Sequence, residues 1–342
     1  MHGGKGDLIL HEKKILASAI WVLVIIGVVI CYFCVKAFTG QDKYPITIAV
    51  SKTPLSTPFY VASAINAFEN TCVDVNIVQV TGGQAAFAKV MSDEVDFSTS
   101  SDSVIAFQSL TSRDFVTHAM FVQSDNDVKL ITRTDDKIES MADLKGKRVG
   151  VTKGTSSEYI LSTLLAIEGL SMNDVVIKNY QPEALLKGFS QHEVDAILPW
   201  EPFGFQALQL LNKKIKIHDT KSLSTLSFNL ISKTADSALV EKAKCVIQGL
   251  NTAIDYIVSN PEAAKKIVIA ELEVAPEFIT WVWSDYIFKL GLNDALILNI
   301  KSQAIWAMEA QLEQFEPVYN TERILDSRAL LEVSPGSVNL SM

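Results

Sequence analysis

Two stretches of this chain, about 100 residues apart, follow the same order of strand, polar turn and helix. One begins with Ile46–Lys52 and the other with Arg148–Lys153, and both runs end in a hydroxyl residue followed by lysine. Further along, the acidic-Val-Asp-apolar step of Glu94–Phe97 is answered by Glu193–Ala196. Strand–turn–helix patterning alone produces part of this likeness. The offset near 99 to 101 at each landmark nevertheless favours a duplicated α/β unit.

The segment from Arg148 to Leu170 indicates what each unit offers to a ligand. A β-branched strand runs into the hydroxyl-rich turn Gly154–Ser157, and a helical pattern follows. A helix N-terminus leaves backbone N–H groups unsatisfied, and hydroxyl side chains supplement them. Such a turn suits a small anionic or polar group, although an ordinary helix cap has the same residues.

Polar turns follow the predicted strands of both units. Ligands of doubly wound sheets bind at the carboxyl ends of the strands. An offset of 99 pairs Ser101 with Trp200 and Asp102 with Glu201, each pair lying between a strand and a helical stretch. Two facing lobes would therefore surround one cleft with matching turns. These turns are Ser51–Thr57, Ser100–Ser103, Gly154–Ser157 and Trp200–Glu201.

An uncharged run of 21 residues, Ile15–Val35, is long enough to cross a bilayer. Lys5, Lys13 and Lys14 precede it and favour a cytoplasmic N-terminus. The sequence therefore predicts a cytoplasmic tail at 1–14, a transmembrane anchor at 15–35 and an extracytoplasmic remainder. A cleaved signal peptide is the alternative, but its apolar core usually spans about 7–15 residues.

Charge and composition exclude several kinds of site. A net charge of −9 without a cluster of basic residues argues against nucleic-acid binding. Cys31 and Cys34 lie in or beside the predicted anchor, and the five scattered histidines predict no metal site, no cofactor and no Ser/His/Asp set. Cys72 and Cys245 fall in the exported part, where they could pair; buried free thiols are the preferred interpretation.

The second half of the chain is mainly helical by pattern. Helices are predicted at 240–258, 261–272, 277–289 and 294–314, with one short strand at 227–232. We expect this half to pack back on the first lobe. The predicted boundaries are 44–132 plus 222–315 for lobe 1, 133–221 for lobe 2, and 316–342 for a loosely ordered C-terminal tail.

The order of these motifs resembles the solute-binding proteins of the nitrate/sulfonate/taurine and thiamine-precursor group of ABC transporters. The resemblance rests on the glycine- and hydroxyl-rich turn at Gly154, the aromatic-acid-proline step Trp200–Pro202 and the acidic-Val-Asp steps, and it covers roughly Tyr44–Ala310. It implies an α/β, bilobal periplasmic-binding-protein fold of type II. Two doubly wound lobes joined by a hinge would close over a small solute for an ABC permease.

The resemblance also implies which residues bind the ligand. The predicted set is Ser51, Thr53, Thr57, Gly82, Ser101, Asp102, Gly154, Thr155, Ser156, Ser157, Trp200 and Glu201. Trp200 would supply a flat wall, and the hydroxyl turn would bind an anionic group. Asp102 and Glu201 would bind a nitrogen, which favours a zwitterionic or amino-bearing solute. Alternatively, Trp200 is a core aromatic and the two acids only cap helices.

Two residues beyond this set are candidates for the cleft, and one nearby lysine is not. Phe228 and Asn229 lie where the chain returns to lobe 1 and could reach the ligand, whereas Lys153 is expected in solvent. The chain's five arginines lie outside the predicted cleft turns, so sulfonate binding through bidentate arginine is not expected.

The most favoured function is a solute-binding protein tethered to the inner membrane by one helix, with its lobes in the periplasm. A ligand sensor acting on a separate membrane partner is the alternative, and a thiamine-pyrimidine enzyme is less favoured. That chemistry would need a cysteine-rich metal motif and a histidine in the cleft. The predicted turns contain neither.

Overall fold

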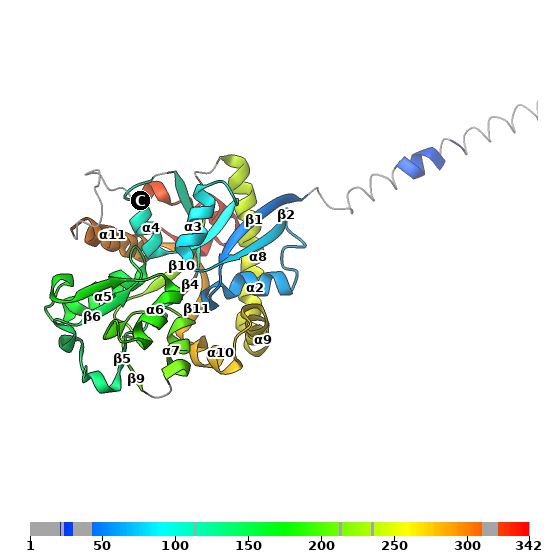
Figure 1. The fold of residues 1–342 in the computed structure, drawn as a ribbon. Coiled ribbons are helices and arrows are strands. Elements are labelled where there is room, and N and C mark those ends of the chain that lie inside the picture. The colour runs from blue at the N-terminus through cyan, green and yellow to red at the C-terminus, as the bar shows by residue number, and fades with distance from the viewer. Residues whose placement is uncertain are drawn as a thin grey trace, which may run out of the picture. The chain divides into compact units, whose positions relative to one another are not determined.

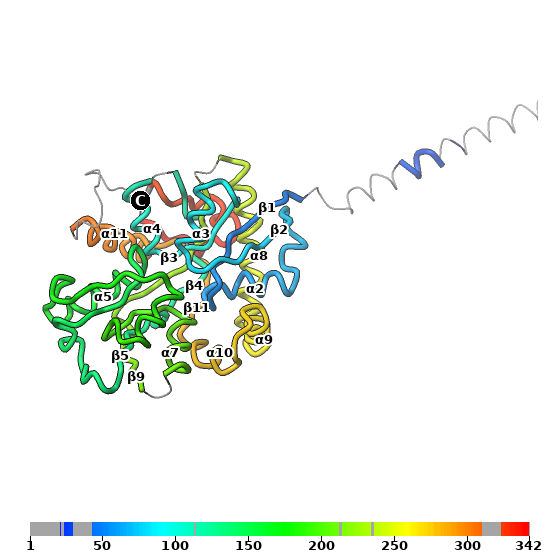
Figure 2. Tube along the Cα trace, in the orientation of Figure 1, coloured from blue at the N-terminus to red at the C-terminus, as the bar shows by residue number. Residues whose placement is uncertain are grey.

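The structure is a computed structural model that describes Trp21 and residues 24–29, 43–112, 114–211, 214–233, 236–309 and 321–341. Figures 1 and 2 show their course. All of the predicted tail 1–14 and most of the predicted anchor 15–35 lie outside these residues. Trp21 and residues 24–29 are helical, and none of the helices in the described ranges has the length and apolar content to cross a bilayer. Residues 45–342 form a compact unit.

The first lobe is built on a seven-stranded mixed sheet in the order β12-β11-β4-β10-β3-β1-β2. Its strands are β1 (Tyr44–Ser51), β2 (Val73–Val80), β3 (Phe97–Ser101), β4 (Phe115–Ser124), β10 (Leu226–Lys233), β11 (Tyr286–Asn293) and β12 (Val338–Asn339). β1 pairs in parallel with β3, whereas β10 runs antiparallel to both β3 and β4. Every residue of β3 is buried, as expected for a strand inside a covered sheet.

Two groups of helices cover this sheet. The first group consists of α2 (Thr57–Ala64), α8 (Ser237–Ser259), α9 (Pro261–Leu272), α10 (Pro276–Val282) and α12 (Arg328–Val333). The second group consists of α3 (Gly83–Met91), α4 (Asp102–Gln108) and α11 (Asp294–Glu309). Their apolar side chains and those of the sheet form one continuous core.

The second lobe has a five-stranded sheet in the order β7-β6-β8-β5-β9. Its strands are β5 (Ile131–Arg133), β6 (Arg148–Val151), β7 (Val176–Asn179), β8 (Ala196–Ile197) and β9 (Ile215–Ile217). Its helices are α5 (Ser156–Ile167), α6 (Pro182–Ser190) and α7 (Phe203–Leu211). Two separate apolar clusters, one containing α5 and the other α6 and α7, indicate that both faces of the sheet are covered.

Short 3-10 turns complete the two lobes. They are η1 (Pro54–Ser56), η2 (Thr134–Asp136), η3 (Met141–Leu144), η4 (Met172–Asp174), η5 (Trp283–Asp285), η6 (Thr321–Ile324) and η7 (Pro335–Ser337).

The predicted duplication is confirmed by the sheet topology. The order β2-β1-β3 in the first lobe matches β7-β6-β8 in the second. The aspartate of each acidic-Val-Asp step makes the same hydrogen bond: Asp96 Oδ2 accepts from the Thr47 N–H at 2.8 Å, and Asp195 Oδ2 accepts from the Arg148 N–H at 2.9 Å. The first bond joins the residue before β3 to β1, and the second joins the residue before β8 to β6.

The chain crosses between the lobes twice, from β4 to β5 and from β9 to β10. Val128 and Leu130 pack in one second-lobe cluster and Ile131 in the other. The first crossing therefore comes several residues before the predicted boundary at 132/133, because these apolar side chains are buried in lobe 2. The predicted strand at 227–232 is confirmed as part of β10.

Two predictions in the C-terminal third differ from the structure. The predicted helix at 277–289 ends as α10 at Val282, and Tyr286–Asn293 forms β11, which pairs antiparallel with β4. Residues 321–341 are not a loose tail, because α12 and β12 lie there. β12 extends the sheet in parallel with β11, and Leu330 of α12 is fully buried. In both segments, contacts with residues distant in the sequence determine the secondary structure.

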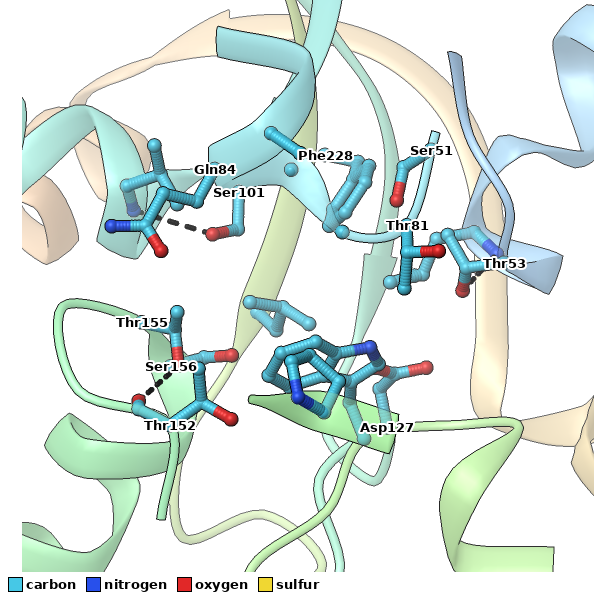
Figure 3. Close-up of a pocket in the computed structure, with 18 of the residues that line it drawn as sticks. Ser51, Thr53, Thr81, Gln84, Ser101, Asp127, Thr152, Thr155, Ser156 and Phe228 are labelled. Carbon is cyan, nitrogen blue, oxygen red and sulfur yellow. Dashed lines mark hydrogen bonds between the residues drawn. The ribbon is translucent and has the colours of Figure 1, made fainter. Parts of the chain in front are cut away.

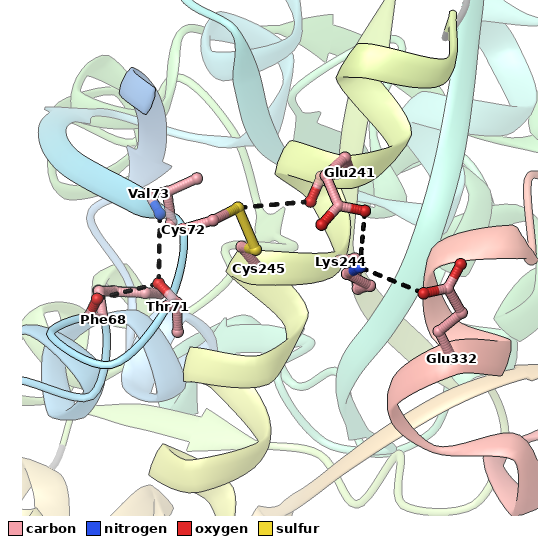
Figure 4. The surroundings of a disulfide bond; sticks show 8 residues. All are labelled: Phe68, Thr71, Cys72, Val73, Glu241, Lys244, Cys245 and Glu332. Atoms are coloured by element: carbon pink, nitrogen blue, oxygen red, sulfur yellow. Dashed lines mark hydrogen bonds and ion pairs between the residues drawn. A yellow bond between two sulfur atoms is a disulfide. The ribbon is translucent and has the colours of Figure 1, made fainter. Parts of the chain in front are cut away.

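The preferred interpretation of Cys72 and Cys245 as free thiols is wrong. They form a disulfide with a Cα–Cα distance of 5.6 Å across 173 residues of sequence (Figure 4). Cys72 immediately precedes β2 and Cys245 lies in α8. The bond therefore ties the edge of the first sheet to the long helix that packs on it.

We expect the double substitution Cys72→Ala with Cys245→Ala to lower the free energy of unfolding by about 2–4 kcal/mol. A cross-link across so long a loop restricts the unfolded chain. Urea unfolding of the full-length protein with and without dithiothreitol measures the effect. Reductant should destabilise the natural protein and leave the double variant unchanged; equal sensitivity of both proteins would contradict the prediction.

Candidate functional site

A cavity of about 610 Å³, its mouth included, lies between the two lobes (Figure 3). Both lobes and the first crossing contribute to its wall. We call it the inter-lobe cavity; its lining residues are Ser51, Thr53, Leu55, Thr81, Gly82, Gly83, Gln84, Ala85, Ser101, Val104, Asp127, Thr152, Thr155, Ser156, Gln181, Pro182, Trp200, Leu226 and Phe228. Hydroxyl and amide groups dominate its polar part, and two aromatic rings belong to its apolar part.

The first-lobe wall consists of residues at the carboxyl ends of β1, β2 and β3. Ser51 ends β1, and its backbone is held by the Thr99 hydroxyl, which accepts from the Ser51 N–H at 2.9 Å. Gly82 precedes α3 with a φ of +85°, and a Cβ there would lie 3.5 Å from the Trp200 ring. Its positive φ favours glycine. Ser101 caps α4 by accepting from the Val104 N–H at 3.2 Å.

The second-lobe wall is built in the same way. Thr155 caps α5, donating to the Thr152 carbonyl at 2.7 Å and accepting from the Ser157 N–H at 3.3 Å. Ser156 begins α5 and lines the cavity. Trp200 follows β8, and its backbone pairs with Val128 of the first crossing. The wall therefore combines a helix N-terminus with one large aromatic side chain.

The structure brings most of the predicted set to the cavity. The residues that line it are Ser51, Thr53, Gly82, Ser101, Thr155, Ser156 and Trp200, together with Phe228 of β10. The predicted residues outside the lining are Thr57, Asp102, Gly154, Ser157 and Glu201. Asn229 is also outside it, and its amide donates to the Ser100 carbonyl at 3.3 Å. Lys153 is exposed, as expected.

Asp102 has a structural position instead of the predicted place in the cleft. Its side chain is fully buried, and its carboxylate accepts from the N–H groups of Ser103 at 2.9 Å and Ser227 at 3.2 Å, and from the Asn299 amide. Burial raises the pKa of Asp102 to about 7, against the opposing effect of these bonds. These donors engage both of its carboxylate oxygens and join α4 to β10 and α11.

Glu201 is also turned away from the cavity. It is fully buried, and its Oε2 accepts from the Phe205 N–H at 3.0 Å. Lys129 Nζ lies 3.9 Å from Glu201 Oε1, and Asp285 Oδ2 lies 3.3 Å from the same ammonium. Burial raises the pKa of Glu201 to about 8, although Lys129 opposes the shift. We call Asp127, Lys129, Glu201 and Asp285 the hinge cluster.

The other predicted residues outside the lining are engaged by nearby groups. The Thr57 hydroxyl donates to the Pro54 carbonyl at 2.6 Å, and the Ser157 hydroxyl donates to the Leu198 carbonyl at 2.6 Å. The Gly154 N–H donates to Glu158 Oε2 at 2.9 Å. These three residues shape the turns that carry the lining side chains.

Several residues that line the cavity were not predicted, although their positions directly after strands could have indicated them. Thr81 and Gln84 follow β2, whereas Thr152 and Gln181 follow β6 and β7. The rule that ligands bind at the carboxyl ends of strands applies to β2 and β7 as it does to their neighbours. Asp127 lies on the first crossing and Leu226 begins β10, and the local sequence pattern predicted neither residue in the cavity.

The lining favours binding through neutral donors and acceptors. Among the described residues that line the cavity there is no lysine, arginine or histidine. The group spaced to hold a metal within the described ranges is Cys72, Glu241 and Cys245, and its two cysteines are joined in the disulfide. The cavity is therefore a hydroxyl- and amide-rich pocket with an aromatic wall and one carboxylate, Asp127.

We expect the free energy of unfolding to fall as pH rises from about 4.5 to 8, with Glu201 contributing. Its pKa is 4.5 in the unfolded reference and about 8 in the fold. The folded state thus keeps a proton that the unfolded state releases in this range. The contribution of Glu201 to the free energy of unfolding is fully present below pH 4.5 and is lost as the pH rises to about 8.

Glu201→Gln should make this decline shallower, because glutamine retains the acceptor for the Phe205 N–H without titrating. Urea unfolding at intervals from pH 5 to 8 measures the slope. Glu168→Gln, at an exposed position, is the matched control and should retain the natural slope. An unchanged slope in Glu201→Gln would contradict the assignment.

Comparison with known proteins agrees with this architecture. The chain is 32% identical over 144 residues to a protein of Brucella abortus (strain 2308) whose name describes a binding protein. It is 30% identical over 138 residues to a Bacillus subtilis (strain 168) protein whose name describes aliphatic sulfonates binding. The matches cover 42% and 40% of this chain, and only 39% and 42% of those relatives' lengths.

Solved structures show the same fold. The alkanesulfonate-binding protein SsuA from Xanthomonas axonopodis pv. citri, bound to MOPS, superposes with a TM-score of 0.69 at 18% identity, covering 88% of this chain and 100% of that one. The periplasmic aliphatic sulphonate binding protein SsuA from Escherichia coli gives 0.69 at 18%, covering 82% and 97%. The predicted α/β periplasmic-binding-protein fold is thus confirmed, with mixed sheets. The family described as NMT1/THI5 like matches residues 53–264, and this chain belongs to that family.

Proposed function

We propose that this chain is an extracytoplasmic solute-binding protein that captures a small polar or zwitterionic solute and delivers it to an ABC permease. The observation that carries the proposal is the inter-lobe cavity, because its lining comes from both lobes. A site divided between two lobes is completed only when they approach each other. The names of the relatives, which describe binding proteins, support the same function.

Contacts between the lobes support capture by closure. The Thr53 hydroxyl of the first lobe is 3.4 Å from the Glu201 carbonyl of the second, as donor to acceptor. Elsewhere, Tyr159 of α5 meets Trp306 of α11 with ring centroids 5.6 Å apart. A solute that contacts both walls would favour this closed arrangement over an open one, because it binds the closed form more tightly.

Within the cavity we assign the solute's contacts to the lining members of the predicted set. Trp200 provides a flat face for an apolar portion. Thr155 and Ser156 stand at the N-terminus of α5, where hydroxyls and N–H groups favour an anionic or polar portion. Ser51, Thr53 and Ser101 supply hydroxyls from the opposite wall. We propose no catalytic residue.

We further propose that residues 15–35 anchor the protein in the inner membrane, with both lobes in the periplasm. The uncharged run supports the anchor, and the described part of it is helical with exposed apolar side chains such as Trp21, Ile25 and Val28. The disulfide supports an oxidising compartment.

Ligand binding tests the proposal most directly. A thermal-shift screen of the full-length protein would use sulfonates, amino acids, pyrimidines, nitrate and aromatic carboxylates. A solute at about 1,000 times its Kd adds roughly 4 kcal/mol to stability, which is readily measured. We expect Trp200→Ala to weaken the responding solute by about 2–3 kcal/mol, roughly 30- to 150-fold.

The matched control is Trp283→Ala, which changes a tryptophan that packs against Phe288 away from the cavity. It should bind the solute with the natural Kd. If no compound stabilises the protein, or if both variants bind with the same Kd, the proposed site is wrong.

Fractionation and co-purification test the anchor and the partner. We expect the natural protein to remain in the membrane pellet after carbonate washing, and deletion of residues 1–42 to release it. Mild detergent extraction should co-purify a permease with its ATPase. A membrane protein without an ATPase would favour the sensor alternative, and release of the natural protein by carbonate would contradict the anchor.

A further inference from the structure

Asp127 lies on the first crossing between the lobes and lines the inter-lobe cavity (Figure 3). It is only 2% exposed. Its Oδ1 accepts from the Tyr286 hydroxyl at 2.8 Å. Its other oxygen, Oδ2, is buried, and no donor in the described part of the chain lies within hydrogen-bonding distance of it. A buried carboxylate oxygen without a donor is destabilising, and a ligand that donates a hydrogen bond to it would remove this cost.

The neighbouring charges do not satisfy Asp127. Within the hinge cluster, the Lys129 ammonium lies 3.3 Å from Asp285 and 3.9 Å from Glu201, and it also donates to the Asn126 carbonyl. Lys221 adds a second ammonium, 3.0 Å from the other oxygen of Asp285. The carboxylates of Asp127, Glu201 and Asp285 therefore share two ammonium groups. Lys129 and Lys221 both form their ion pairs with acids other than Asp127.

The surroundings of Asp127 suit a nitrogen cation. The Asp127 carbonyl accepts from the Glu201 N–H at 3.2 Å, and Val128 pairs with Trp200, so the aspartate and the indole belong to adjacent segments. A cation near both would gain a carboxylate partner and an aromatic face. Because the described lining contains no basic side chain, no lysine, arginine or histidine of the wall competes for Asp127.

We propose that Asp127 determines specificity by accepting a hydrogen bond from the solute, which carries an ammonium or amidinium nitrogen at this end of the cavity. The inference rests on the proposed solute-binding function and names the chemical class that it selects. It replaces Asp102 and Glu201, whose carboxylates lie outside the lining, as the group that recognises nitrogen.

The proposal has a pH signature. Burial raises the pKa of Asp127 to about 7, with Asp285 adding to the shift and Tyr286 and Lys129 opposing it. A cationic solute needs the ionised aspartate, so its affinity should rise as pH increases from 6 to 8. Glu201 titrates in the same cluster, so the rise assigned to Asp127 is the part that Asp127→Asn removes.

Matched pairs of compounds test the inference in the full-length protein. The pairs are 2-aminoethanesulfonate with 2-hydroxyethanesulfonate, and benzylamine with benzyl alcohol, which differ only in the nitrogen. We expect at least one amine to bind at least tenfold more tightly than its hydroxyl partner. Asp127→Asn should reduce that preference at least tenfold, whereas Asp125→Asn, on the same segment but outside the lining, should retain it.

Each outcome decides a different point. Equal binding of amine and hydroxyl partners, or an undiminished preference in Asp127→Asn, overturns the role of Asp127 and leaves solute binding intact. No stabilisation by either compound of any pair overturns the amine class, and failure of the wider screen as well overturns the proposed function. The pair comparison in the natural protein needs no variant, so it decides the class even if Asp127→Asn fails to fold.

Discussion

Asp96 and Asp195 accept hydrogen bonds from the backbone of β1 and β6, at 2.8 and 2.9 Å, and so fix the register of parallel strands. Parallel pairing gathers the carboxyl ends of β2, β1 and β3 at one edge, and those of β7, β6 and β8 at another. Turns at such ends carry exposed N–H groups and short hydroxyl side chains. Because the chain crosses twice between the sheets, both edges contribute to one cavity, and its position follows from strand pairing.

Charged side chains on the first crossing, Asp127 and Lys129, are the second feature that defines the site. Lys129, only 2% exposed, is shared by Asp285 and Glu201. Burying ions is costly unless each finds a partner, so such clusters are sensitive to the removal or addition of one charge. Asp127 belongs to this cluster and also lines the cavity. Under the proposed function, the charge of the solute and the closure of the lobes would therefore act on the same few residues.

Much of the fold could be predicted from local pattern. The strand at 148–151 and the helix at 261–272 follow from periodicity and proline, and the duplication located the turns at Ser101 and Trp200. The errors came where long-range contacts decide. Tyr286–Asn293 is a strand because it completes a sheet edge beside β4, and Asp102 leaves the cleft because β10 and α11 supply donors to its carboxylate. No local pattern reveals these partners.

The sequence by itself determined the two α/β units, their internal repeat and the polar turns between strand and helix. These features depend on residues close together in the chain, through side-chain period, capping and turn chemistry. The tertiary structure alone decided that Cys72 pairs with Cys245, that Asp102 and Glu201 are buried away from the cavity, and that Asp127 lines it. Those outcomes depend on which distant segments meet, because burial and charge pairing are set by the whole packed chain.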